Sequence, residues 1–205
     1  MFGLTYGSSK IFHAMATIKK MSSRPLYFGF IAVPVFSNAI VAGFVNFILT
    51  RVFPGQNLFD IFKISPDLAL VFNLTPFAYA IVILSAYSHP VFSAVKSGVW
   101  NELSTRRINN SAITIGLISF TTWLLPIFEV LAIFVFNSDT GPWFNLTAFS
   151  VINLLTGIMS FMISYYIADF IISRNYLVQL SQIVPFKSVP GIYYVSIRTK
   201  FLIFM

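Results

Sequence analysis

The sequence predicts an all-α polytopic membrane protein, with four complete transmembrane helices and the beginning of a fifth. Of its 205 residues, 57% are hydrophobic and only 9% are charged, whereas soluble domains carry about 25% charged residues. The apolar residues gather in runs of about 20 or more, the length that a helix needs to cross the hydrocarbon core. Most Lys and Arg residues lie between these runs, in every second connection, as loops on one side of a membrane require.

The first 25 residues predict a cytoplasmic leader. A secretory signal peptide would have a short apolar core and a small-residue cleavage site soon after its basic start. Here the first apolar run begins only at Leu26, and it is too long for such a core. A translation start at Met15 or Met21 is an alternative. The leader contains four cations and no acid, namely Lys10, Lys19, Lys20 and Arg24.

The first two spans are predicted at about residues 26–53 and 68–87. Each contains a proline, Pro34 and Pro76. Membrane helices tolerate proline where neighbouring groups satisfy the carbonyl that it frees. Residues 26–205 are predicted to form one transmembrane domain.

Residues 91–110 predict an amphipathic helix that lies along the lipid headgroups, with a partner-binding helix as the alternative. Apolar residues recur there at helical spacing, and cations supply a polar side. The apolar positions are Phe92, Val95, Val99 and Leu103, and the cations are Lys96, Arg106 and Arg107.

The third and fourth spans are predicted at about residues 112–136 and 146–173. The short connection between them requires antiparallel packing. Pro126 marks a kink in the third span. In the fourth span Gly157 and Ser160 have the spacing of small residues at close helix contacts.

A fifth helix is predicted to begin at residue 201, directly after two cations. Five residues cannot span a bilayer, so we expect a fragment or a truncated reading frame. The leader, residues 91–110 and residues 174–200 hold 4, 3 and 4 cations, and the other two loops hold only Arg51 and Lys63. The positive-inside rule then predicts a cytoplasmic N-terminus in an inner or plasma membrane. The residues expected to set this topology are Lys19, Lys20, Arg106, Arg107, Arg198 and Lys200.

Two acids lie inside predicted spans, and an intramembrane carboxylate is a functional candidate by default. Glu129 lies in the outer half of the third span. Its alternatives are a protonated carboxyl, one that contacts water, or one bonded to neighbouring backbone. Asp169 lies near the inner end of the fourth span, where pairing with Arg174 or Arg107 is the simpler interpretation.

Several kinds of chemistry have no counterpart in the sequence. There is no cysteine, and the two histidines are too few and too separate for a metal cluster. No catalytic or cofactor-binding motif occurs. The net charge of +7 could suggest nucleic acid in a soluble protein, but here the cations lie in loops and report topology.

The second half resembles the N-terminal membrane region of bacterial HAMP-linked class III adenylate/guanylate cyclases. The resemblance covers about half of the chain, from Asn101 onward, and it implies six membrane helices before a cytoplasmic linker and catalytic domain. Neither of these follows here, so no cyclase residue is carried over. The motifs are Arg106-Arg107, Trp123-Leu124-Leu125-Pro126, a tyrosine-ended span reaching Arg174, Ile183-Val184-Pro185, and the segment 189–202 with Ser196, Arg198 and Lys200.

The sequence therefore predicts the membrane-anchoring and sensory region of a bacterial signalling protein, which contacts lipid and forms a homodimer. The competing class is a fragment of a small transporter, which would need polar residues that line a cavity at the membrane midplane, or paired broken helices. The three span prolines favour that class, and the scarcity of buried polar groups counts against it. A purely structural assembly subunit is a third class.

Overall fold

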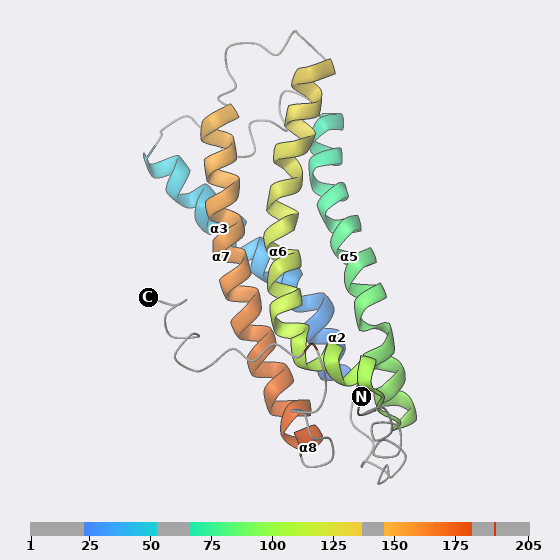
Figure 1. Cartoon of the computed structure of the whole chain (residues 1–205). Coiled ribbons are helices and arrows are strands. Elements are labelled where there is room, and N and C mark those ends of the chain that lie inside the picture. The colour runs from blue at the N-terminus through green and yellow to red at the C-terminus, as the bar shows by residue number, and fades with distance from the viewer. Residues whose placement is uncertain (1–22, 53–65, 137–145, 182–190, 192–205) are drawn as a thin grey trace, which may run out of the picture.

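The computed structural model describes residues 23–52, 66–136, 146–181 and 191, and these residues are almost entirely helical. Four long helices form a bundle (Figure 1), which confirms the predicted all-α class. The expected fifth helix and most of the leader lie outside the described residues. The long helices are α3 (Val33–Val52), α5 (Pro66–Ser97), α6 (Glu102–Phe136) and α7 (Leu146–Ile172), and the short ones are α2 (Arg24–Tyr27), η1 (Phe28–Ala32), η2 (Ser173–Leu177) and α8 (Val178–Ser181).

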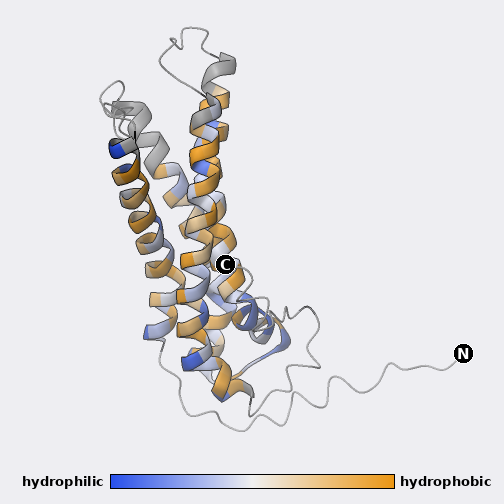
Figure 2. Ribbon diagram, turned by 90° about the vertical axis from the view of Figure 1, so that its left-hand side faces the viewer, coloured by the Kyte–Doolittle hydropathy of each residue, from blue (hydrophilic) through white to orange (hydrophobic). Residues whose placement is uncertain are grey.

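Apolar residues recur along the four long helices (Figure 2), each of which is apolar enough to cross a membrane. In each of the four candidate spans, only 33% to 39% of the most apolar window is buried within the protein, so most of its side chains face outward. Exposed side chains include Phe36, Phe128 and Phe170. Water would make this exposure costly, whereas lipid does not. The protein is therefore a multi-pass membrane protein, with spans at Arg24–Ile48, Leu74–Ser97, Glu102–Ala132 and Phe149–Leu180.

Helix α6 is the centre of the bundle, with α5 on one side of it and α7 on the other. The contact of α6 with α7 is the most extensive one, and the two helices run antiparallel as predicted. Helix α3 crosses obliquely behind α6 and α7, and it diverges from α5 along its length (Figure 1).

The predicted surface helix at residues 91–110 is wrong. Helix α5 continues to Ser97, and α6 already begins at Glu102. Gly98 ends α5 with a φ of 75°, and its N–H donates to the Ala94 carbonyl at 2.8 Å, as in a left-handed helix C-cap. Val99, an apolar position of the predicted helix, is 60% exposed.

The start of α6 has a reciprocal N-terminal cap. The Ser104 N–H donates to Asn101 Oδ1 at 2.8 Å, and the Asn101 N–H donates to Ser104 Oγ at 3.0 Å. This pair satisfies two donors in the manner of a capping box. Local cap chemistry therefore outweighs the amphipathic pattern and turns this segment into a tight helix–helix connection.

Two glycines allow the close approach of α6 and α7. A Cβ added to Gly116 would lie 2.9 Å from Phe161 Cδ2 and 3.2 Å from its carbonyl oxygen. A Cβ added to Gly157 would lie 2.9 Å from Phe120 Cδ2 and 3.1 Å from its carbonyl oxygen. Each helix thus places a phenylalanine over the glycine of the other, which confirms the close contact expected at Gly157 and adds Gly116 to it.

At two prolines, Pro34 and Pro90, the structure adjusts to the helical hydrogen bond that the proline removes. Pro34 cannot donate to the Phe30 carbonyl, and the preceding turn, η1, is widened to a π-helix in which the Val33 N–H donates to the Phe28 carbonyl. Pro90 cannot donate to the Ala86 carbonyl, and a side chain of α6 provides a donor there instead. Arg107 Nη1 lies 2.9 Å from that carbonyl oxygen.

Candidate ligand-binding site

The side chain of Asn38 joins three helices inside the bundle. From α3, its Oδ1 accepts hydrogen bonds from Trp123 Nε1 at 2.8 Å and from the Ser160 hydroxyl. Its Nδ2 donates to Thr122 Oγ1 at 3.3 Å. All three partners lie on α6 or α7, so one amide links α3 to both of them.

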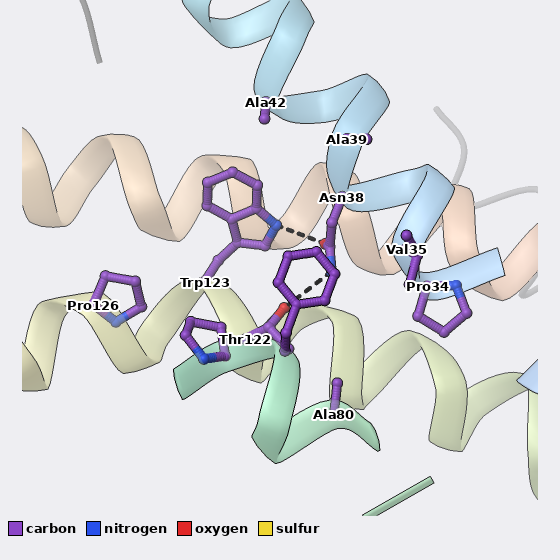
Figure 3. Close-up of a pocket in the computed structure, with 11 residues that line it drawn as sticks. Pro34, Val35, Asn38, Ala39, Ala42, Ala80, Thr122, Trp123 and Pro126 are labelled. Atoms are coloured by element: carbon purple, nitrogen blue, oxygen red, sulfur yellow. Dashed lines mark hydrogen bonds between the residues drawn. The ribbon is translucent and has the colours of Figure 1, made fainter. Parts of the chain in front are cut away.

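A cavity of about 300 Å³ lies beside Asn38, between α3, α5 and α6 (Figure 3). It is at the lower end of the size range of small-molecule sites. Its walls are mostly apolar, and their polar groups belong to Asn38, Thr122 and Trp123 (Figure 3). The lining residues are Pro34, Val35, Asn38, Ala39, Ala42, Pro76, Phe77, Ala80, Thr122, Trp123 and Pro126.

The three span prolines noted in the sequence all line this cavity, one from each of its helices. Pro34 belongs to α3, Pro76 to α5 and Pro126 to α6. A proline removes the i→i−4 hydrogen bond of its own helix. Pro126 thereby leaves the carbonyl of Thr122, which also lines the cavity, without that partner.

One hydrogen-bond donor at the cavity wall, an N–H of the Asn38 amide, is available for a ligand. An asparagine amide has two N–H donors, and among the described residues only one donor of Asn38 is engaged, by Thr122. The Thr122 hydroxyl itself donates to the Ser119 carbonyl at 2.7 Å. A ligand in the cavity would therefore meet one free amide N–H and mostly hydrocarbon elsewhere.

Glu129 lies one turn beyond Pro126 on α6 and is not among the residues that line the cavity. Both carboxylate oxygens are buried, and within the described part of the chain neither has a hydrogen-bond partner. The role of Glu129 stays a hypothesis.

Asp169 lies far along α7, toward the end of the bundle that carries α8, and the structure does not bring it to Glu129. Its Oδ1 accepts a hydrogen bond from the Ser173 hydroxyl at 3.4 Å. The Arg107 guanidinium is engaged elsewhere, because it also donates to the Tyr87 carbonyl at 2.9 Å and lies 5.3 Å from the Tyr87 ring centroid. Asp169 does not contribute to the cavity.

Two of the six residues expected to set topology are described, Arg106 and Arg107. Both lie in the first two turns of α6, at the end of the bundle where α2 and α8 also lie. Arg106 packs beside Gly191, where an added Cβ would lie 3.0 Å from Arg106 Cδ. The other four, Lys19, Lys20, Arg198 and Lys200, lie outside the described residues.

Asn38 was not predicted from the sequence as a site residue, and the number of buried polar side chains is larger than predicted. The buried set includes hydroxyl and amide side chains from every long helix, among them Ser37, Ser88, Ser119, Thr122, Asn153, Thr156, Ser160 and Ser164. The Ser164 hydroxyl of α7 donates to Ser119 Oγ of α6 at 2.7 Å. The available signal was one asparagine within an otherwise apolar run, since such a side chain can form hydrogen bonds with a neighbouring helix.

Comparison with known proteins identifies no relative: no family model matches this chain, and no curated protein or solved structure matches it. The architecture and the cavity are therefore the observations from which a function has to be inferred.

Proposed function

We propose that this chain is the sensory membrane domain of a signalling protein, and that its input is a small amphiphile taken up from the bilayer. The cavity between α3, α5 and α6 carries this proposal, because it combines apolar walls with one available N–H on Asn38. The matching ligand is largely hydrocarbon and carries one oxygen that accepts a hydrogen bond, such as a hydroxyl or a carbonyl.

The position of the cavity gives a physical route from binding to response. Asn38 holds α3 to Thr122 and Trp123 of α6, and to Ser160 of α7. A ligand at this place contacts the side chains that hold the helices together. It would favour whichever helix arrangement it binds more tightly, which is the requirement for any ligand-driven change.

Photolabelling with a diazirine analogue of octanol tests the proposal. The full chain in lipid nanodiscs would be irradiated with the probe and then digested, and the labelled residues would be identified by mass spectrometry. We expect saturable labelling of the cavity residues. Ala42→Phe places a ring in the cavity and should abolish this labelling.

The matched control is Ala78→Phe, which adds the same ring to an exposed position of α5 outside the cavity lining. It should leave the labelling intact. Labelling that does not saturate, or that Ala42→Phe and Ala78→Phe affect equally, would refute a specific site.

Transport is the second candidate function, and it is supported by the convergence of Pro34, Pro76 and Pro126 on one cavity. Interrupted helices around a central site are common in transporters. Uptake of the diazirine amphiphile into sealed proteoliposomes that is faster than into protein-free liposomes, and that Ala42→Phe slows, would support transport. Saturable labelling without uptake would favour the sensory function.

The relation to HAMP-linked cyclases, the signalling output, the homodimer and the cytoplasmic N-terminus remain proposals. They are supported by the order of short motifs from Asn101 onward and by the distribution of cations. Among the described residues, every Lys and Arg except Arg51 lies at the end of the bundle that carries α2 and α8. The sequence of the gene beyond Met205 would test whether an output domain follows.

A further inference from the structure

A second pocket, the interfacial pocket, lies between α2 and the last turns of α5, at the end of the bundle that is rich in cations. Its volume is about 420 Å³. Its polar and aromatic lining consists of Ser23 and Tyr27 on the α2 side, and of His89, Phe92, Ser93 and Lys96 on α5. It is separate from the α3–α5–α6 cavity, with which it shares no lining residue.

Its polar side chains form one stripe of donors. His89, Ser93 and Lys96 are spaced by four and three residues, so they share a face of α5. Ser23 adds a hydroxyl from the opposite wall. Within the described part of the chain, none of these four side chains has a hydrogen bond or an ion pair, and no acid lines the pocket.

One lysine and two serine hydroxyls, in a lining that contains no acid, match the chemistry of a phosphate group. Lys is a point-charge phosphate binder, and hydroxyls complete the coordination of phosphate oxygens. A carboxylate could accept hydrogen bonds from the same donors. The surroundings of the pocket favour phosphate, because the anionic headgroups of membrane phospholipids carry it.

The surroundings of the pocket favour a lipid over a soluble phosphate compound. The rings of Tyr27 and Phe92 lie 4.4 Å apart and connect the two walls. Beside them, Phe28 and Ile31 are each 49% exposed. Aromatic rings at the end of a span are typical of the headgroup level, and the exposed apolar side chains offer a surface for acyl chains.

We propose that the interfacial pocket binds the phosphate of an anionic phospholipid, with Lys96 as the charged contact, Ser23 and Ser93 as hydroxyl donors, and the acyl chains along Phe28 and Ile31. This inference does not depend on the proposed sensory function. Anionic lipids are abundant in the cytoplasmic leaflet, which agrees with the orientation predicted from the cations.

Native mass spectrometry of the full chain in detergent, with added phosphatidylglycerol or phosphatidylcholine, tests this site. We expect retained adducts with phosphatidylglycerol and few with phosphatidylcholine. Lys96→Gln should reduce the affinity for phosphatidylglycerol about fivefold, the effect of one basic residue near a lipid surface. Ser93→Leu should also reduce it, because it fills the pocket without a change in net charge.

Arg174→Gln is the matched control, since it removes one exposed cation from the same end of the bundle outside the pocket. Equal losses in Lys96→Gln and Arg174→Gln would reveal only a diffuse surface potential and overturn the site. Binding of glycerol 3-phosphate alone, with displacement of phosphatidylglycerol, would assign a soluble phosphate compound and overturn the lipid. Circular dichroism melting curves that match the wild type would establish that all three variants fold.

Discussion

At the residue scale, Asn38 is the most consequential side chain of the described bundle. A polar side chain within a span needs hydrogen-bond partners inside the protein, either in its own helix or on another one. Asn38 meets this requirement with three hydrogen bonds to α6 and α7. It thus defines how α3 crosses its neighbours, and it also provides the free donor of the cavity.

Asn38→Leu should destabilise the bundle by about 2 kcal/mol, because each of three interhelical hydrogen bonds contributes about 0.6 kcal/mol in a membrane protein. Denaturant unfolding in mixed micelles would measure the loss. Asn153→Leu is the control, since among the described residues Asn153 Nδ2 donates only to the Phe149 carbonyl of its own helix at 2.9 Å. If both variants lose the same stability, the interhelical role of Asn38 is wrong.

Gly116→Ala should cost about 1 to 3 kcal/mol, the usual range for an overpacked core position. The new methyl would meet the ring and the backbone of Phe161 at the α6–α7 contact, and backbone cannot move aside as a side chain can. The same substitution at Gly43, where nothing lies within 4 Å of the added Cβ, should be neutral or stabilising. Thermal unfolding in detergent would compare them, and a neutral Gly116→Ala would argue against close packing there.

At the element scale, α5 and α6 are connected by hydrogen bonds between Arg107 and the part of α5 that Pro90 interrupts. Pro90 leaves the Ala86 carbonyl of α5 without its helical donor, and Arg107 of α6 supplies one. The Tyr87 hydroxyl returns a hydrogen bond to the Arg107 carbonyl at 2.9 Å. A residue expected to set topology therefore also fixes the relative position of two helices.

A double-mutant cycle would measure this connection. Arg107→Gln alone should lower stability by about 1.5 to 3 kcal/mol, the value of a hydrogen bond from a charged group. Pro90→Ala restores the helical donor to the Ala86 carbonyl, so Arg107→Gln should cost clearly less in that background. A coupling energy of zero, where neighbours that interact give about 0.5 to 3 kcal/mol, would show that Arg107 acts only through its charge.

The sequence predicted the helices better than it predicted their contacts. Runs of about 20 apolar residues are sufficient to identify spans, because lipid imposes the same requirement on each helix separately. The segment at residues 91–110 was predicted wrongly because Gly98 and the Asn101–Ser104 cap outweigh its amphipathic spacing. The cavity could not be predicted, because its lining combines residues as distant in the chain as Pro34 and Pro126.

At the scale of the whole molecule, the distribution of cations predicts that the end of the bundle with α2 and α8 faces the cytoplasm. The chain contains no cysteine, so single cysteines can be introduced without any other change. In intact cells, a membrane-impermeant maleimide should label Thr147→Cys and should leave Ser97→Cys unlabelled until the cells are opened. The reverse pattern would invert the orientation predicted from the cations and exclude the cyclase-like arrangement.

The uninterrupted first part of α6 has a mechanical consequence. No proline occurs between Glu102 and Trp123, a length of about 32 Å at the helical rise per residue. This segment can act as a stiff lever whose pivot lies at the cavity. A tilt of only about 5° at Trp123 would displace the tip at Glu102 by about 3 Å, enough to turn a small event among lipid chains into a movement in the aqueous phase.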